Sequence, residues 1–95
     1  MKGNKDGEVL DEYSLIILAQ NGEKDAFQSL VVLCYPHVSK FLIKLCGDET
    51  LSEDLIQETL LKLVRSIDRF DFNGKISFST WVMTIAKNCY LDHLR

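Results

Sequence analysis

The chain has 95 residues, enough for one small domain that buries roughly two-thirds of the surface of its unfolded chain. Hydrophobic residues make up 46% and charged residues 26%, which excludes an intrinsically disordered protein. The net charge of −3 argues against a general nucleic-acid binder. However, residues 1–60 hold five Lys or Arg against eleven Asp or Glu, whereas residues 61–95 hold six against three. We therefore expect the acidic and the basic part to meet different partners.

No apolar run approaches the roughly 20 residues that a membrane-spanning helix needs. The N-terminal sequence MKGNKDGEVLDE also lacks the apolar core of a signal peptide. The sequence therefore indicates a cytoplasmic protein. The three cysteines, Cys34, Cys46 and Cys89, lie in apolar helical patterns and are expected to be reduced and buried.

The spacing of apolar residues predicts an all-α fold, a compact bundle of four to five helices. Residues 1–10 are expected to be a flexible N-terminus. The first helix is predicted over residues 11–20, and an apolar-periodic segment follows over residues 23–46. Because a proline inside a helix removes one hydrogen bond, Pro36 predicts either a kink or two abutting helices.

The third helix is predicted over residues 51–67, with Thr50 and Glu53 forming a capping box. Residues 68–76, DRFDFNGKI, read as a loop. Ser77 or Ser79 can cap a last helix that runs to the end of the chain.

The third helix has two contrasting faces. At 100° per residue, one arc is apolar and must face the core; it holds Ile56, Leu60, Leu63, Val64 and Ile67. The opposite arc holds Asp54, Gln57, Glu58, Leu61 and Arg65. A solvated surface is the simpler interpretation, but the large apolar Leu61 in the middle of a polar arc is typical of a protein-binding patch.

The last helix also has two faces. Val82, Ile85, Ala86 and Cys89 should be buried. The other face has no carboxylate, which suits phosphate oxygens and base edges; it holds Thr80, Thr84, Lys87, Asn88, Leu91 and Arg95.

The loop before this helix adds aromatic rings, a glycine and Lys75, which suit a single nucleic-acid strand. A second interpretation is that Phe70, Phe78 and Trp81 are simply core residues.

The motifs EDLIQET, FSTW, TIAKN and DHLR occur in this order in the second half of the chain. With this spacing, the sequence closely resembles region two of bacterial RNA polymerase sigma factors of the extracytoplasmic-function group. The resemblance covers residues 10–95. It implies a transcription initiation factor domain that binds core RNA polymerase and is not an enzyme.

The resemblance implies two interfaces. Region two docks on the clamp coiled coil of the largest polymerase subunit, which corresponds here to Asp54, Leu55, Gln57, Glu58 and Leu61. It also recognises and melts the minus-ten promoter element by capturing a flipped base of the non-template strand. The loop Phe72–Phe78 with Asn88 would form the base pocket, and the implied DNA-binding residues are Phe72, Gly74, Lys75, Ser77, Phe78, Ser79, Thr80, Trp81, Lys87, Asn88 and Arg95.

The resemblance further implies an anti-sigma factor as a partner, through which a cytoplasmic sigma factor can be held at the membrane. Members of the family continue into a helix-turn-helix domain, which is absent here. The chain stops at Arg95, either as a fragment or as a naturally truncated protein. We expect a fragment, because Arg95 ends a helix without a cap or stop signal, and we expect residues 11–95 to form region two.

Other functions have weaker support in the sequence. Cys34 with His37 and Cys89 with His93 could each offer two zinc ligands, but nothing in the sequence brings the pairs together. Asp92 and His93 are adjacent, so on a helix they point about 100° apart and do not form a catalytic pair. We expect no metal and no cofactor. A helical interaction module that acts only through an anti-sigma or adaptor partner stays open.

Overall fold

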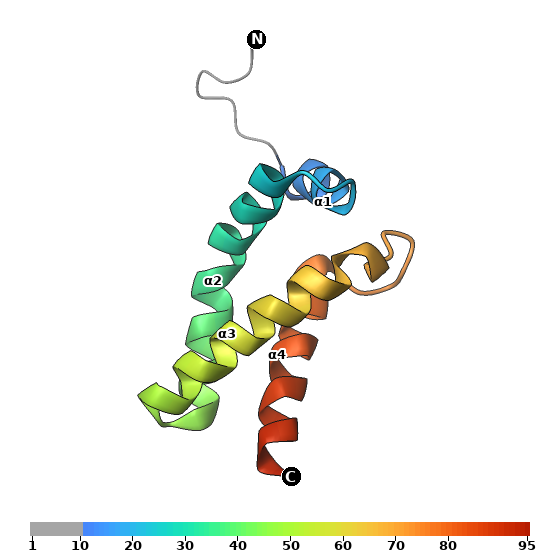
Figure 1. Ribbon diagram of the computed structural model, residues 1–95. Coiled ribbons are helices and arrows are strands. Elements are labelled where there is room, and N and C mark those ends of the chain that lie inside the picture. Colours follow the sequence, from blue (N-terminus) through green and yellow to red (C-terminus); the bar gives the residue numbers. More distant parts are fainter. Residues whose placement is uncertain (1–10) are drawn as a thin grey trace.

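The computed structural model describes residues 11–95, and the predicted flexible segment 1–10 lies outside the described residues. This part of the chain forms four α-helices and one 3-10 helix, with no strand among the residues described (Figure 1). In chain order the elements are α1 Glu12–Gln20, α2 Lys24–Cys46, α3 Glu49–Ser66, η1 Ile67–Arg69 and α4 Phe78–Leu94. The predicted all-α bundle is confirmed.

The predicted cap of α3 is wrong. The side chain of Asp48, and not that of Thr50, accepts a hydrogen bond from the Leu51 N–H, at 3.1 Å. The helix therefore begins at Glu49, two residues earlier than predicted, and Thr50 lies inside its first turn. An ionised Asp at this position accepts a backbone hydrogen bond and also favours the positive end of the helix dipole.

Pro36 does not divide α2, which continues through it as one helix of 23 residues. Proline at this position leaves the Val32 carbonyl without its helical partner. Val32 and Pro36 are both exposed, so water can satisfy that carbonyl. The helix ends at Gly47, whose φ of 68° is left-handed and whose N–H donates to the Ile43 carbonyl.

By length and composition, α2 is apolar enough to cross a membrane, contrary to the expectation from the sequence. The core helix of a small bundle can meet the same criteria. In this fold α2 is the central element, because it packs against α1, α3 and α4. Leu30, Val38 and Leu42 of α2 are completely buried in the common core.

The core-facing arc of α3 is rotated from the predicted one. Val64 is 50% exposed, whereas Leu55 and Thr59 are buried. Thr59 can be buried because its hydroxyl donates to the Leu55 carbonyl at 2.7 Å, and Ser52 is satisfied in the same way by the Glu49 carbonyl. The buried side of α3 therefore includes these small hydroxyl residues.

Candidate functional site

Two mostly polar stripes of side chains face each other where α3 packs against α4 and continues into η1. Lys62, Arg65 and Arg69 follow one another three and four residues apart, and so do Ile85, Asn88 and Asp92 on α4. Between them lies a groove of about 500 Å³, which we call the basic groove. Its lining residues are Lys62, Arg65, Ser66, Arg69, Ile85, Asn88, Asp92 and Arg95.

The basic groove holds four cationic side chains and a single carboxylate, that of Asp92. Asp92 is paired with Lys62 and with Arg95. Arg65 and Arg69 form no ion pair with any of residues 11–95. Two guanidinium groups are thus available to an anion, and Asn88 lies exposed beside them. Guanidinium groups are well suited to phosphate, and an amide is suited to base edges.

A second groove, of about 350 Å³, lies between the first half of α3 and the end of α4. We call it the acidic groove; its lining residues are Leu51, Asp54, Leu55, Glu58, Cys89, Asp92 and His93. It holds three carboxylates and no lysine or arginine. Asp92 is common to both grooves. The acidic groove is therefore suited to a cationic partner.

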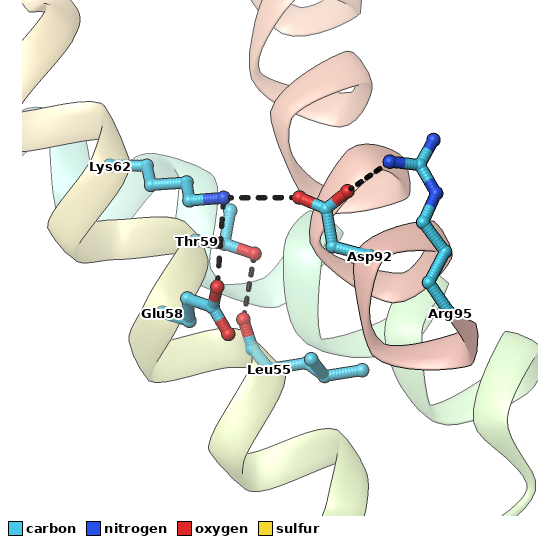
Figure 2. A network of polar contacts seen from close by, with 6 residues as sticks. All are labelled: Leu55, Glu58, Thr59, Lys62, Asp92 and Arg95. Carbon is cyan, nitrogen blue, oxygen red and sulfur yellow. Dashed lines mark hydrogen bonds and ion pairs between the residues drawn. The ribbon is translucent and has the colours of Figure 1, made fainter.

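An ion-pair network connects the two grooves (Figure 2). The ammonium nitrogen of Lys62 lies 3.6 Å from Glu58 Oε2 and 3.6 Å from Asp92 Oδ2. The other oxygen of Asp92 lies 3.5 Å from Arg95 Nη1. These side chains are well exposed, so each pair contributes only about 0–1 kcal/mol to stability. The network is weak enough to be rearranged by a bound partner.

The pKa of Lys62 is raised above its usual value by its neighbours. The Coulombic contribution of Cys89 is the largest cause of the raised pKa, burial opposes it, and the carboxylates of Glu58 and Asp92 add smaller contributions in the raising direction. Lys62 is therefore fully cationic at neutral pH.

Aromatic rings hold the loop between η1 and α4 against the bundle. Phe70 stands 5.3 Å, centroid to centroid, from Phe78 and also from Trp81. The amide of Gln20 on α1 donates to the carbonyls of Ile67 and Phe70, at 3.0 Å each. These contacts anchor the start of the loop, so its position relative to α4 is set by packing.

The outer part of the loop is exposed and internally bonded. The Asp71 carboxylate accepts from the Asn73 N–H at 2.8 Å, and the Asp71 carbonyl accepts from the Gly74 N–H at 3.0 Å. The Gly74 N–H is therefore occupied within the turn, and a Cβ at this position would stand 3.1 Å from the Asp71 carbonyl. Phe72 is 36% exposed, and its ring packs edge-on against Tyr13 at 4.7 Å.

Comparisons with known proteins identify the family of this domain. Residues 30–95 match the family described as sigma-70 region 2. The chain belongs to the sigma-70 region 2 family.

Its relatives place the domain among the sigma factors of the extracytoplasmic-function (ECF) group. It is 36% identical, over 85% of its length, to the ECF RNA polymerase sigma factor BldN of Streptomyces coelicolor. It is 38% identical, over 80% of its length, to the RNA polymerase sigma factor CarQ of Myxococcus xanthus, and 33% identical, again over 80%, to the ECF sigma factor SigW of Bacillus subtilis. The matched part is only 30%, 42% and 40% of these relatives.

A solved structure shares the fold. It is an NMR structure of an engineered region 2 of sigmaE in complex with GTAAAA, with a TM-score of 0.76 and 34% sequence identity. The alignment covers 90% of this chain and 86% of that one. The family and the fold expected from the sequence motifs are thus confirmed.

The predicted DNA-binding residues lie mainly in three parts of the domain: the basic groove, the loop and the start of α4. Asn88 and Arg95 line the basic groove, while Lys87 is exposed outside its lining. Phe72, Gly74 and Lys75 lie in the loop, and none of residues 71–77 lines the basic groove. Since an α-helix rises 1.5 Å per residue, Asn88 lies roughly 16 Å along α4 from Ser77. The loop and Asn88 are therefore set apart along α4, and a base pocket formed by both stays a prediction.

The residues at the start of α4 have local roles. The Ser77 hydroxyl caps the helix by accepting from the Thr80 N–H at 3.1 Å, which confirms the first of the two predicted caps. Ser79 lines a different cavity, and Thr80 is exposed. Phe78 is 3% exposed and Trp81 is half-buried. Phe78 is thus a core residue and, in this structure, offers no ring to a DNA base.

The predicted polymerase-binding residues lie together with one exception. Asp54, Gln57 and Glu58 are exposed, and Leu61 is 54% exposed. Leu55 is only 3% exposed. Its side chain belongs to the core-facing arc of α3 and also lines the acidic groove, so a contact through Leu55 stays a prediction.

The cysteines are free, but only Cys89 is fully buried. Cys34 and His37 line a cavity of about 280 Å³ between α1, α2 and α4. Burial, reinforced by the charge of Glu12, raises the pKa of the Cys34 thiol to about 11. Within residues 11–95, no three metal-binding side chains gather.

Sequence reasoning missed Lys62 and Arg69, and it placed Arg65 only on the polar arc of α3. A signal was present, since these three cations lie on one helical face. The sequence did not show that this face lies beside the face of α4 that carries Asn88.

Proposed function

We propose that this domain is the part of an ECF sigma factor that binds core RNA polymerase and recognises and melts the minus-ten promoter element. The observation that carries the proposal is the position of Asn88 in the basic groove, beside Arg65 and Arg69. An anionic strand in this groove would place a base edge at the amide while its phosphates meet the guanidinium groups.

Phosphate neutralisation supplies affinity in this proposal, and Asn88 supplies selectivity. Cationic side chains release counterions from the strand, which favours binding of any sequence. An Asn side chain can donate to and accept from the same base, a pairing best suited to adenine. The structural neighbour at a TM-score of 0.76 is in complex with GTAAAA, a sequence rich in adenine, which supports the same use of this domain.

Melting a duplex costs about 1.4 kcal/mol of stacking per base step. A sigma domain can offset part of this cost by holding an extruded base. The exposed ring of Phe72, next to Tyr13, provides a stacking surface on the loop. We propose that the strand passes from this loop, past Lys75 and the start of α4, toward the basic groove.

The polymerase interface is assigned to the exposed face of α3. Asp54 and Glu58 supply negative charge next to the exposed side chain of Leu61. The clamp coiled coil that region two of this group docks on offers an arginine-rich helix, for which such a face is complementary in charge. Residues 11–95 then act in the cytoplasm, where core polymerase is found, with an anti-sigma factor as a further partner.

An interaction module without DNA binding is the second candidate. It is favoured by the apolar side chains that α2 exposes, among them Val32, Leu33, Tyr35 and Ile43. Such an adaptor would bind protein but would not distinguish DNA sequences.

The test is fluorescence anisotropy with labelled single-stranded oligonucleotides, one carrying GTAAAA and one with the same bases in scrambled order. A sigma domain, with or without core polymerase, should bind one of these two oligonucleotides more tightly than the other. Asn88→Ala should remove about 1–3 kcal/mol of that preference, without loss of stability because Asn88 is exposed. Lys87→Ala is the matched control, which should change the affinity for both strands alike. Equal preference in parent and Asn88→Ala would contradict the role of the amide.

A further inference from the structure

One side of α2 is apolar and exposed. From residue 26 to residue 39 the helix contains no Lys, Arg, Asp or Glu. Although α2 packs against α1, α3 and α4, these helices leave Val32 65% exposed and Leu33 and Tyr35 about half exposed. In Figure 1 the middle of α2 lies at the left edge of the bundle. Apolar side chains that gather on an exposed helix face are typical of a protein-binding surface.

These side chains form one stripe along the helix axis. At 100° per residue, Val32, Pro36 and Ile43 point within about 40° of one another, with Leu33 and Tyr35 on either flank. All five are exposed, and we call them the α2 stripe. A straight ridge of this kind packs against a second helix that lies along it.

Charged residues of opposite sign lie at the two ends of the α2 stripe. Asp25 precedes Ile43 by five full helical turns, so it continues the line of the stripe, whereas its neighbour Lys24 points about 100° away. Lys40 and Lys44 flank the other end. Asp25, Lys40 and Lys44 are exposed, and none of them forms an ion pair with any of residues 11–95.

We propose that the α2 stripe binds the α2 stripe of a second copy of this chain, with the two helices antiparallel about a twofold axis midway between Val32 and Pro36. This arrangement sets Val32 of each copy against Pro36 of the other, and Asp25 of each copy beside Lys44 of the other. A parallel arrangement would set Asp25 against Asp25 and Lys44 against Lys44. The charges therefore select the antiparallel pairing, in which every contact occurs twice.

The dimer should be weak and reversible. Each copy contributes one face of a single helix, which is less than the roughly 800 Å² per partner of a standard interface. We therefore expect a dissociation constant of about 10–100 μM.

Sedimentation equilibrium of the parent chain tests for the dimer. Between about 5 and 500 μM the mean mass should rise from 10.9 kDa toward twice that value. Val32→Glu should raise the dissociation constant at least about tenfold, because it brings two like charges together in an apolar contact near the twofold axis. Val64→Glu is the matched control, since it makes the same change at a half-exposed valine of α3 and should alter the constant less than about twofold.

Charge reversal tests the antiparallel pairing. Asp25→Lys and Lys44→Asp should each weaken self-association about three- to tenfold, because each turns two attractive contacts into repulsive ones. An equimolar mixture of the two variants should associate like the parent, because the heterodimer again places Lys beside Asp at both ends. General repulsion between negatively charged chains predicts otherwise. Asp25→Lys lowers the net negative charge and would then strengthen association, whereas only Lys44→Asp would weaken it.

Thermal melting of every variant verifies that the fold is retained. If the parent stays monomeric at every concentration, the proposal is wrong and the α2 stripe is left to a protein of different sequence. A dimer that Val32→Glu leaves intact would place the interface elsewhere, and tighter association of Asp25→Lys would contradict the antiparallel pairing. None of these measurements uses DNA or polymerase, so their outcome is independent of the proposed function.

Discussion

The basic and acidic grooves are built from the same pair of helices but carry opposite charge. Along α3 the acidic residues Asp54 and Glu58 come first, and the basic residues Lys62 and Arg65 follow them. This order agrees with the helix dipole, which favours acidic residues near the N-terminus and basic residues near the C-terminus. One amphipathic helix can thus present two surfaces of opposite charge, because its charged residues are separated along its axis.

The largest expected effect comes from truncating a core side chain beneath both grooves, which should impair the two grooves alike. Leu63 is completely buried in α3. Leu63→Ala should lower the free energy of unfolding by about 2–5 kcal/mol, a large part of the roughly 5–15 kcal/mol typical of a domain. Urea denaturation measures the loss, and both binding activities should fall together.

Val64→Ala is the matched control for this prediction. Val64 is the next residue and is half exposed, so its truncation should change stability by no more than about 0.5 kcal/mol. If Leu63→Ala impaired one groove and spared the other at a temperature where it is folded, the idea of a common support would be wrong.

The second prediction isolates the basic groove. Arg65→Ala combined with Arg69→Ala should weaken binding of all single strands alike and reduce the slope of log affinity against log salt by about 2. Binding to core polymerase should be unchanged. Anisotropy titrations at several salt concentrations provide the measurement. Lys75→Ala on the loop is the control. If this substitution weakened single-strand binding more than the double substitution, the phosphates would contact the loop rather than the basic groove.

The third prediction isolates the exposed face of α3. Leu61→Ala and Asp54→Ala should each weaken association with core polymerase by about 1 kcal/mol, or roughly fivefold. Both side chains are exposed, so thermal unfolding should be unaffected. Glu53→Ala, at an exposed neighbouring position outside the acidic groove, is the control. If both variants captured core polymerase as well as the parent does, the assignment of this face as the polymerase interface would be wrong.

The smallest expected effect tests whether Ser77 only caps α4 or also contacts DNA. Because its hydroxyl caps α4, Ser77→Ala should cost about 0.5–2 kcal/mol of stability. Oligonucleotide affinity should be unchanged at a temperature where the variant is fully folded. A loss of affinity larger than the loss of stability explains would restore Ser77 as a DNA contact.

The sequence by itself determined the helices and most of their exposed faces. With 3.6 residues per turn, Leu61 and Leu63 point to different sides of α3, whatever the helix packs against. For the same reason Asn88 and Cys89 point to different sides of α4. The motif order also established the family. Local signals were less reliable at helix ends, because Asp48 and Thr50 are both good caps and their spacing does not say which one is used.

Only the tertiary structure decided where the core-facing arc of α3 is centred and which faces meet. Leu55 and Thr59 are buried because α3 rotates that side into the bundle, and the hydroxyl of Thr59 finds its hydrogen bond within the helix. Arg65 and Arg69 come beside Asn88 through packing between helices separated by a loop. Periodicity orients the side chains of one helix, but the contact between two helices depends on the shapes that their buried side chains present to each other.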